Sequence, residues 1–177
     1  MAITMERKGY GQVEPNHLSG IVTGQIYAQL PAAGSITQLE QGQFAKYDYA
    51  AGEVNFTGEG EFMLVYNEEK LYDERKQSHK DFVYKTEDFT DKLLYPRLIR
   101  TYVGDIITTN TIEVANDSDT KEVGTVSLTV GDKLQPDTAD GFLKKATGKD
   151  LTGMVWKVVK ETTMPDGKPG VKIQRIQ

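Results

Sequence analysis

The clearest alternation of apolar and polar positions lies in the last quarter of the chain, from Gly153 to Gln177. Met154, Trp156 and Val158 occupy every second position, and a loop of Pro, Asp, Gly and Lys at 165–170 separates them from a second β-branched run. Every second side chain of a strand points to the same face, and Pro and Gly favour the backbone angles of a turn. The stretch predicts a terminal β-hairpin whose tryptophan, the only one in the chain, lies in a core.

Further strands are predicted between residues 96 and 130. The runs 98–103 and 106–114 are rich in β-branched residues and are separated by the turn Gly104-Asp105, and the run 123–130 alternates most cleanly. We expect 106–114 and 123–130 to form a hairpin with one buried and one solvated face. We also expect these strands to share a single β-core with the C-terminal hairpin. A second Gly-Asp pair at 131–132 is an internal echo, too short to define a repeat.

The stretch 36–96 changes character halfway along. Residues 62–66 are apolar at every position, which predicts a central strand covered on both faces. Residues 67–96 are dense in charges of both signs and lack an apolar stripe of helical spacing, so we expect a long surface excursion. Within it Phe89 and Leu93 have the i,i+4 spacing of a short helix, which Pro96 would end.

Residues 1–35 are rich in glycine and proline and follow neither a helical nor a strand period. We expect an extended N-terminal arm that buries little and can pair with the edge of a partner's sheet, with a poorly ordered terminus as the alternative. Residues 36–177 are predicted to form a single β-rich domain. The predicted fold class is mainly β: a small antiparallel barrel or sandwich with an extended N-terminal arm and a long charged surface excursion.

Composition narrows the classes of function. The chain has 177 residues, a formal net charge of -5 and no cysteine. It therefore has no disulfide framework, cysteine nucleophile or thiolate metal site. An acidic chain would need a local basic patch to bind nucleic acid, and no such Lys/Arg cluster stands out along the sequence. No apolar run approaches the ~20 residues of a membrane span and no signal-peptide pattern is present, so we expect a soluble protein outside the ordinary secretory route.

Motifs of catalysis, cofactor binding or metal binding are absent from the sequence. The two histidines, His17 and His79, lack the spacing of metal-binding pairs. Residues 117–119, Asp117-Ser118-Asp119, begin like a calcium loop, but the glycine and distal glutamate are missing, so we expect a solvated hairpin tip. Glycine-rich pieces lack the lysine and the strand-to-helix context of a phosphate loop. We expect a protein that is not an enzyme, with no catalytic, cofactor-binding or metal residues.

Two other interpretations stay open at this point. Aromatic residues could form a stacking platform in a β-sandwich carbohydrate-binding module, although aromatics in β proteins more often fill cores or cross-strand pairs. Two carboxylates could assemble in a cleft, as in glycosidases, although nothing in the sequence selects one pair. The aromatic set is Tyr47, Tyr49, Tyr66, Tyr72, Phe82 and Tyr84.

Two stretches of the chain resemble small virion structural proteins of tailed bacteriophages. They are PRLIRTYVGDIITTN, from Pro96 to Asn110, and the closing stretch MVWKVVKETTMPDGKPGVKIQRI. In particular, they are similar to the auxiliary head or capsid decoration proteins that coat a lattice of major capsid protein. The similarity extends over roughly residues 66–177. The glycine-rich N-terminal segment is similar in character to the arms with which such proteins reach across neighbouring capsomers.

This resemblance implies a non-enzymatic protein that binds and stabilises the outside of a phage capsid lattice. Its partner would be the major capsid protein, contacted by multiple copies or by a homo-oligomer, with no direct contact to nucleic acid or membrane. The implied location is the capsid exterior of the virion, after assembly in the host cytoplasm. The family has no catalytic residues, so none is carried over to this chain.

Overall fold

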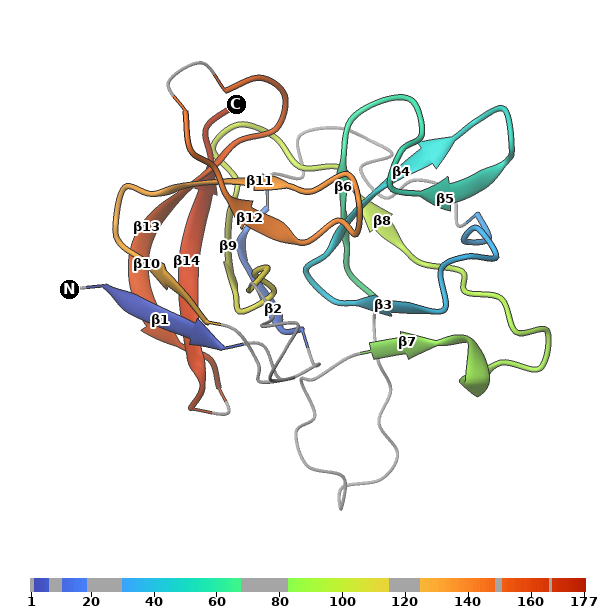
Figure 1. The fold of residues 1–177 in the computed structure, drawn as a ribbon, viewed down its shortest axis with the longest axis horizontal. Coiled ribbons are helices and arrows are strands. Elements are labelled where there is room, and N and C mark those ends of the chain that lie inside the picture. The colour runs from blue at the N-terminus through green and yellow to red at the C-terminus, as the bar shows by residue number, and fades with distance from the viewer. Residues whose placement is uncertain are drawn as a thin grey trace, which may run out of the picture.

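Antiparallel β-sheet makes up nearly all of the regular structure in the described part of this protein (Figure 1). The structure, a computed structural model, describes residues 2–6, 11–18, 30–67, 83–114, 125–148, 151–165 and 167–177. Over these residues the chain forms fourteen strands and one 3-10 helix, and no sheet closes into a barrel. The prediction of a mainly β fold is confirmed. Of the two predicted forms, barrel and sandwich, the open sheets are consistent with the sandwich. The same residues include no helix long and apolar enough to cross a membrane.

The largest sheet has six strands and is built around the predicted C-terminal hairpin. β13 (Trp156–Thr163) pairs with β14 (Pro169–Arg175), and Trp156 is fully buried. β11 adds to the free side of β13, and β9 adds to the free side of β14. The full strand order is β12-β11-β13-β14-β9-β2. The flanking strands are β12 (Leu143–Lys145), β11 (Lys133–Pro136), β9 (Ile106–Thr109) and β2 (Val13–His17).

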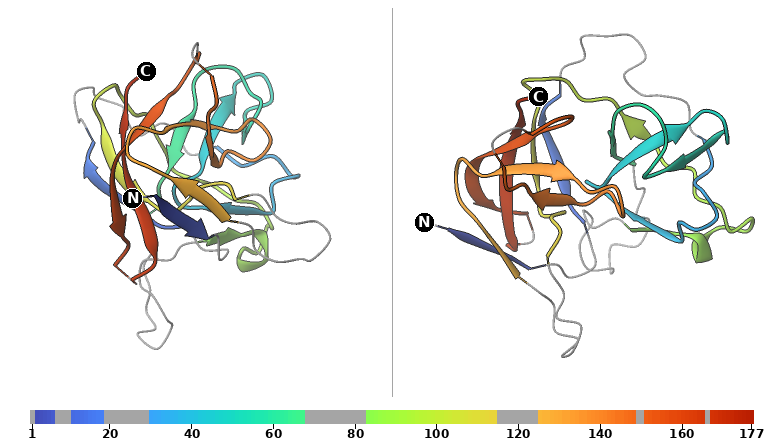
Figure 2. Two further views of the ribbon diagram at one scale, coloured as in Figure 1. Left: turned by 60° about the vertical axis from the view of Figure 1, so that its left-hand side comes forward. Right: turned by 45° about the horizontal axis from the view of Figure 1, so that its top comes forward.

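A second group of strands lies beside this sheet (Figures 1 and 2). It contains a four-stranded sheet of order β5-β4-β6-β8 and the separate pair β3-β7. The six-stranded sheet together with β1 and β10 is termed the first lobe, and this second group is termed the second lobe. Its strands are β3 (Gln38–Glu40), β4 (Phe44–Asp48), β5 (Glu53–Asn55), β6 (Met63–Val65), β7 (Val83–Lys85) and β8 (Leu98–Ile99).

Two apolar cores fill the lobes, and β4 and β6 contribute to both of them. Phe44 and Leu64 lie in the first core with Trp156, whereas Met63 and Val65 lie in the second. Successive residues of a strand point to opposite faces, so β4 and β6 form a layer between the two cores. This layer confirms the prediction of a central strand that is covered on both faces.

The single core predicted for the strands after Pro96 is wrong at its first strand. Ile107 and Leu128 belong to the first core with the C-terminal hairpin, but Leu98 belongs to the second. The strand predicted over 98–103 ends at Ile99, and its pairing with β6 carries it into the second lobe. The sequence pattern shows that Leu98 is buried without showing in which core.

β10 (Thr125–Leu128) does not form the predicted hairpin with β9. It pairs with β1 (Ile3–Glu6) instead, and β9 is already paired on both sides, with β14 and β2. The alternation of β10 is as expected, because Leu128 is buried while Thr125 and Ser127 are exposed. The correction concerns the partner strand, which a local pattern does not select.

Two strands of the N-terminal segment, β1 and β2, are paired within the sheets. β1 places Met5, which is 1% exposed, in the first core, and β2 forms an edge of the six-stranded sheet with Val13 buried. Pro15 suits this position, because proline in sheets is confined mainly to edge strands. These contacts correct the expectation that the segment buries little. Strands of 4 and 5 residues are too short to show a period in the sequence.

The recurring Gly-Asp pairs form two equivalent turns. In each turn the aspartate carboxylate accepts a hydrogen bond of 2.8 Å from the backbone N–H three residues earlier. In each, the glycine N–H donates to a strand of the C-terminal hairpin at 2.8 Å, Gly104 to Arg175 and Gly131 to Val158. Both glycines have a φ of 101°. The short echo in the sequence is therefore a structural repeat, since one turn starts β9 beside β14 and the other starts β11 beside β13.

The C-terminal part of the charged excursion belongs to the second lobe. Residues 68–82 lie outside the described part of the chain, and β7 pairs with β3. The short helix predicted over Phe89 and Leu93 is wrong. Helical geometry between residues 83 and 96 is limited to the 3-10 helix η1 (Thr86–Asp88), and Leu94 is buried in the second core in place of Leu93.

Candidate functional site at the junction of the two lobes

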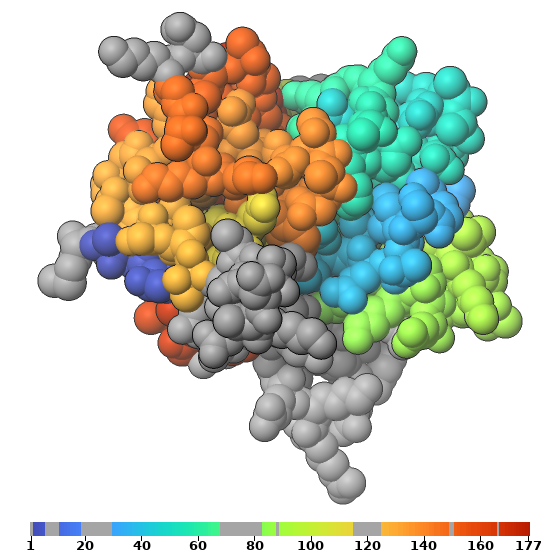
Figure 3. Space-filling model, viewed as in Figure 1, coloured from blue at the N-terminus to red at the C-terminus, as the bar shows by residue number. Residues whose placement is uncertain are grey.

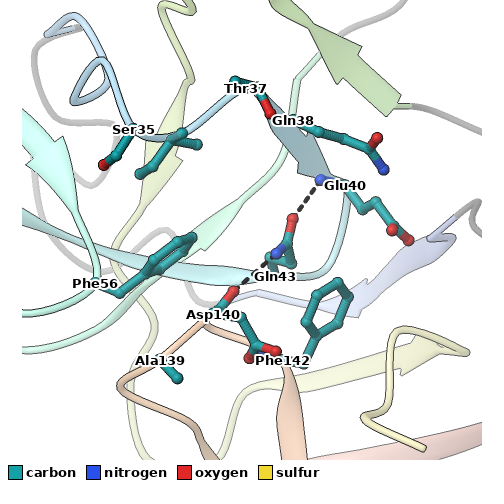
Figure 4. Close-up of a pocket in the computed structure, with 10 residues that line it drawn as sticks. Ser35, Thr37, Gln38, Glu40, Gln43, Phe56, Ala139, Asp140 and Phe142 are labelled. Atoms are coloured by element: carbon teal, nitrogen blue, oxygen red, sulfur yellow. Dashed lines mark hydrogen bonds between the residues drawn. The ribbon is translucent and has the colours of Figure 1, made fainter. Parts of the chain in front are cut away.

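The turn between β11 and β12 docks against the second lobe, where the orange and blue surfaces meet in Figure 3. Phe44 N donates a hydrogen bond of 2.8 Å to Gly141 O, and Gln43 Nε2 donates one of 2.8 Å to Asp140 O. The Oε1 atom of Gln43 accepts a hydrogen bond from Glu40 N (Figure 4). A single buried amide thus bonds to both lobes, using its donor for one and its acceptor for the other.

Gly141 is the point of closest backbone approach at this junction. Its φ is 74°, a value that residues with a side chain rarely adopt. A Cβ atom at this position would lie 2.0 Å from Phe44 O. The dipeptide Asp140-Gly141 is a turn signal that sequence analysis could have used. It would have located the turn, but not the strand against which the turn docks.

A pocket of about 470 Å³ lies beside Gln43 (Figure 4). Ser35, Thr37 and Phe56 come from the second lobe, and Asp140 and Phe142 come from the β11-β12 turn. Hydroxyl, amide and carboxylate groups thus face the same space as two aromatic rings. This combination suits a ligand with both hydrogen-bonding groups and an apolar face.

The structure brings two carboxylates to this pocket, those of Glu40 and Asp140. Sequence reasoning did not select this pair. Asp140 Oδ1 accepts a hydrogen bond of 3.0 Å from Phe142 N, so one of its oxygens stabilises the turn. Glu40 is 1% exposed. The Asp140 carboxylate is therefore engaged within the turn, and the Glu40 side chain is buried beside it in the wall of the pocket.

A second pocket, of about 540 Å³, lies on the other side of the same turn. Lys46 of β4 and Pro136 of β11 are in its wall, and Lys46 Nζ is 4.6 Å from the centre of the Phe62 ring. At this distance the ammonium group is attracted to the electron-rich face of the ring. The two pockets are thus separated by a turn that is itself bonded to the second lobe.

An ion-pair cluster at the rim of the second pocket also joins the lobes. Glu61 Oε2 is 3.0 Å from Arg175 Nη2, and Glu61 Oε1 is 3.3 Å from Arg100 Nε. Arg175 also donates to Thr101 O and, at 3.1 Å, to Thr101 Oγ1. The guanidinium of β14 is therefore bonded to the chain segments that precede β6 and follow β8.

Ion pairs also stabilise the β12 edge of the first lobe. Lys144 Nζ is 2.8 Å from Asp137 Oδ2 and 3.1 Å from Glu113 Oε2, and Lys145 Nζ is 2.7 Å from Asp132 Oδ2. The hydrogen bond from Lys144 is the main cause of a lowered pKa at Asp137. Burial acts to raise the pKa of Asp132, but hydrogen bonds, foremost the one from Lys145, outweigh it and lower that pKa. Hydrogen bonds to Asp137 first, and then to Glu113, raise the pKa of Lys144.

The histidines and the calcium-like loop do not contribute to this junction as the structure describes it. His17 lies at the exposed end of β2. His79 and residues 117–119 lie outside the described part of the chain. Where residues are described, no three His, Asp or Glu side chains are grouped closely enough to hold a metal ion.

The aromatic candidates divide between cores and surface. Tyr72 and Phe82 lie outside the described residues. Tyr47 is 1% exposed in the second core, and Tyr49 is 60% exposed, with the two ring centres 6.0 Å apart and the ring planes at 39°. The remaining two are partly buried, Tyr66 against the first core and Tyr84 against the second. A buried Tyr47 cannot offer its ring face to a sugar.

Comparisons with protein-family models, with curated proteins and with solved structures find no match to this chain. The fold and the junction therefore define the class by themselves. It is a mainly β protein of two lobes that share a central layer and are joined by a hydrogen-bonded turn.

Proposed function

We propose that this protein is a non-enzymatic virion structural protein that binds and stabilises the outside of a phage capsid lattice. The observation that carries the proposal concerns the two stretches that resemble capsid decoration proteins, 96–110 and 154–176. β9 lies in the first stretch and β14 in the second, and these strands are neighbours in the six-stranded sheet. Apart from β8, which the first stretch also contains and which lies in the second lobe, the resemblance thus falls on adjoining strands of the first lobe.

The junction between the lobes supports the same proposal. The Gln43 amide, the backbone contact at Gly141 and the Glu61–Arg175 ion pair fix the lobes relative to each other. A preorganised surface loses little conformational entropy on binding. Many copies that each make a modest contact hold a lattice tightly through multivalency. Binding to the assembled shell but not to a free subunit stabilises the shell by mass action.

Particles that lack this protein test the proposal. We expect them to assemble but to release DNA at a lower temperature, or at a lower magnesium concentration, than complete particles. Adding the purified protein back should restore resistance, and adding the heat-denatured protein should not. The measurement is the fluorescence of a DNA-binding dye during a thermal ramp, together with electron microscopy of the same particles.

Two results would contradict this function. One is the absence of the protein from purified virions, and the other is deletion particles that package DNA and withstand heating as well as complete ones. The carbohydrate-binding alternative would then be favoured, and titration with oligosaccharides would test it directly.

A further inference from the structure

The outward face of the six-stranded sheet carries a group of lysines that the linear sequence does not reveal. Lys157 and Lys160 lie on β13, Lys133 lies on β11, and Lys172 lies on β14. Their neighbours along the strands, such as Trp156, are buried in the first core. Because side chains alternate between faces along a strand, the lysines point away from that core.

The pairing register places these lysines directly opposite one another. Lys133 is the partner of Lys157, and Lys160 is the partner of Lys172. A bulge between Val158 and Lys160 returns Lys160 to the outward face. Strands are about 4.8 Å apart and alternate residues about 7 Å apart. The four ammonium groups therefore rise from one small area of the sheet.

No carboxylate among the described residues neutralises this area. Among the outward-facing residues that are paired across the strands with these lysines, Glu14 is the one carboxylate. It is two strands away from Lys172, roughly 10 Å at normal strand spacing. Glu161, the next residue after Lys160, is in register with the buried Val171 and so belongs to the opposite face. Within the described part of the chain, none of the four lysines lies within salt-bridge distance of a carboxylate.

This arrangement is unfavourable for the isolated fold. Like charges directly opposite each other in a sheet are destabilising, whereas opposite charges in the same place are stabilising. The whole chain has a net charge of -5, so carboxylates are abundant, yet they are absent from the positions facing these lysines. Local features that conflict with stability and have no compensating contact are expected at functional sites.

We propose that this face, which presents Lys133, Lys157, Lys160 and Lys172, is the contact surface for a carboxylate-rich protein surface. Lysine is a mobile point charge that pairs with carboxylates without a fixed geometry. The proposal rests on the proposed function, under which the acidic surface lies on the outside of the capsid lattice. It names the part of the first lobe that makes the contact.

Nucleic acid fits this face less well than an acidic protein does. The outward-facing rows that hold these lysines contain no Phe, Tyr or Trp side chain on which a base could stack, since Trp156 lies on the buried face. These outward rows also contain no arginine, the residue that binds phosphate in a bidentate manner, because Arg175 is paired with Trp156 on the buried face. The negative net charge of the chain opposes the approach of a long polyanion.

A pair of charge-matched variants tests the proposal. The face variant carries Lys157→Glu and Lys172→Glu. The control variant carries Lys85→Glu and Lys92→Glu, which change the net charge equally but lie in the second lobe. The face variant should melt at the same temperature as the wild type or higher, because each new carboxylate faces a lysine. A thermal melt of both variants thus separates loss of contact from loss of folding.

Cosedimentation with capsid shells stripped of the protein measures the contact. We expect the wild type to bind more weakly as salt is added. The face variant should lose at least about tenfold in affinity, while the control variant binds like the wild type. If the wild type binds and the face variant binds equally well, the inference is wrong and the proposed function stands. If the wild type itself does not bind shells, the proposed function fails.

If the wild type does not bind shells, retention on immobilised polyglutamate tests the lysine face by itself. Elution of the face variant at lower salt than the control variant supports an acidic protein partner, and equal elution overturns it. Two other results would also overturn it. One is tighter wild-type binding to a DNA duplex than to polyglutamate, lost in the face variant. The other is lysine-dependent self-association in sedimentation, which would assign the face to a second copy of this chain.

Discussion

Replacing Trp156 by alanine is the most direct test of the first core. Trp156 is fully buried, and its ring centre is 5.7 Å from that of Phe44, a residue of the layer shared by both lobes. Truncation of a buried aromatic side chain to alanine costs about 3–5 kcal/mol. The lost aromatic pair accounts for roughly 0.5–1.5 kcal/mol of this range. For a chain of this length each kcal/mol lowers the melting temperature by about 2–4 °C, so we expect a decrease of roughly 6–20 °C.

Trp156→Phe is the matched control, because it keeps an aromatic ring against Phe44. The indole Nε1 is buried without a protein acceptor among the described residues, so the phenylalanine variant loses no hydrogen bond. We expect it to lose less than half as much stability as the alanine variant. Urea unfolding followed by far-UV circular dichroism measures both variants without relying on tryptophan fluorescence. An unchanged slope with urea would show that stability has changed and not the compactness of either state.

Two results would refute this reasoning. One is a wild-type emission maximum like that of free indole in water, because a ring in the first core is shielded from solvent. The other is an alanine variant within about 1 kcal/mol of the wild type, since that is well below the cost of emptying a buried aromatic site.

Three further predictions follow from the junction and the edges. Gly141→Ala should destabilise the fold by about 1–3 kcal/mol more than Gly52→Ala. The two glycines have similar φ values, 74° and 69°, but of the two only Gly141 would bring a Cβ atom against the backbone of another strand. Equal losses of stability in urea unfolding would disprove this docking. Asp137 has a pKa lowered from 3.8, chiefly by its hydrogen bond from Lys144, so its stabilisation is present above that value and lost as pH falls through the lowered pKa. Asp137→Asn should thus be less stable than the wild type at about pH 7 and equal to it at about pH 2, and a constant difference in melting temperature would contradict this. Met5→Ala should lower the free energy of unfolding by about 2–5 kcal/mol, whereas Thr4→Ala, at an exposed position, should change it by almost nothing. An equally mild effect of both variants would instead support a loosely attached arm over residues 1–35.

The sequence by itself determined the features that depend on neighbouring residues. The alternation around Trp156 predicts β13 and its buried face, and the apolar run before Asn67 predicts the central layer. The Gly-Asp pairs mark two turns that the structure confirms. Each of these follows from the backbone preferences of adjacent residues or from the two-residue period of a strand.

Tertiary structure decided which strands meet. β10 pairs with β1, far away in the chain, and Leu98 joins the second core although its sequence neighbours are predicted to join the first. The two strands of the N-terminal segment are too short to have a recognisable period, and they are held by partners outside it. The register of β11, β13 and β14 alone brings Lys133 opposite Lys157 and Lys160 opposite Lys172. Alternation along a strand fixes the face to which a side chain points, but its neighbours across the sheet depend on long-range pairing that no local pattern encodes.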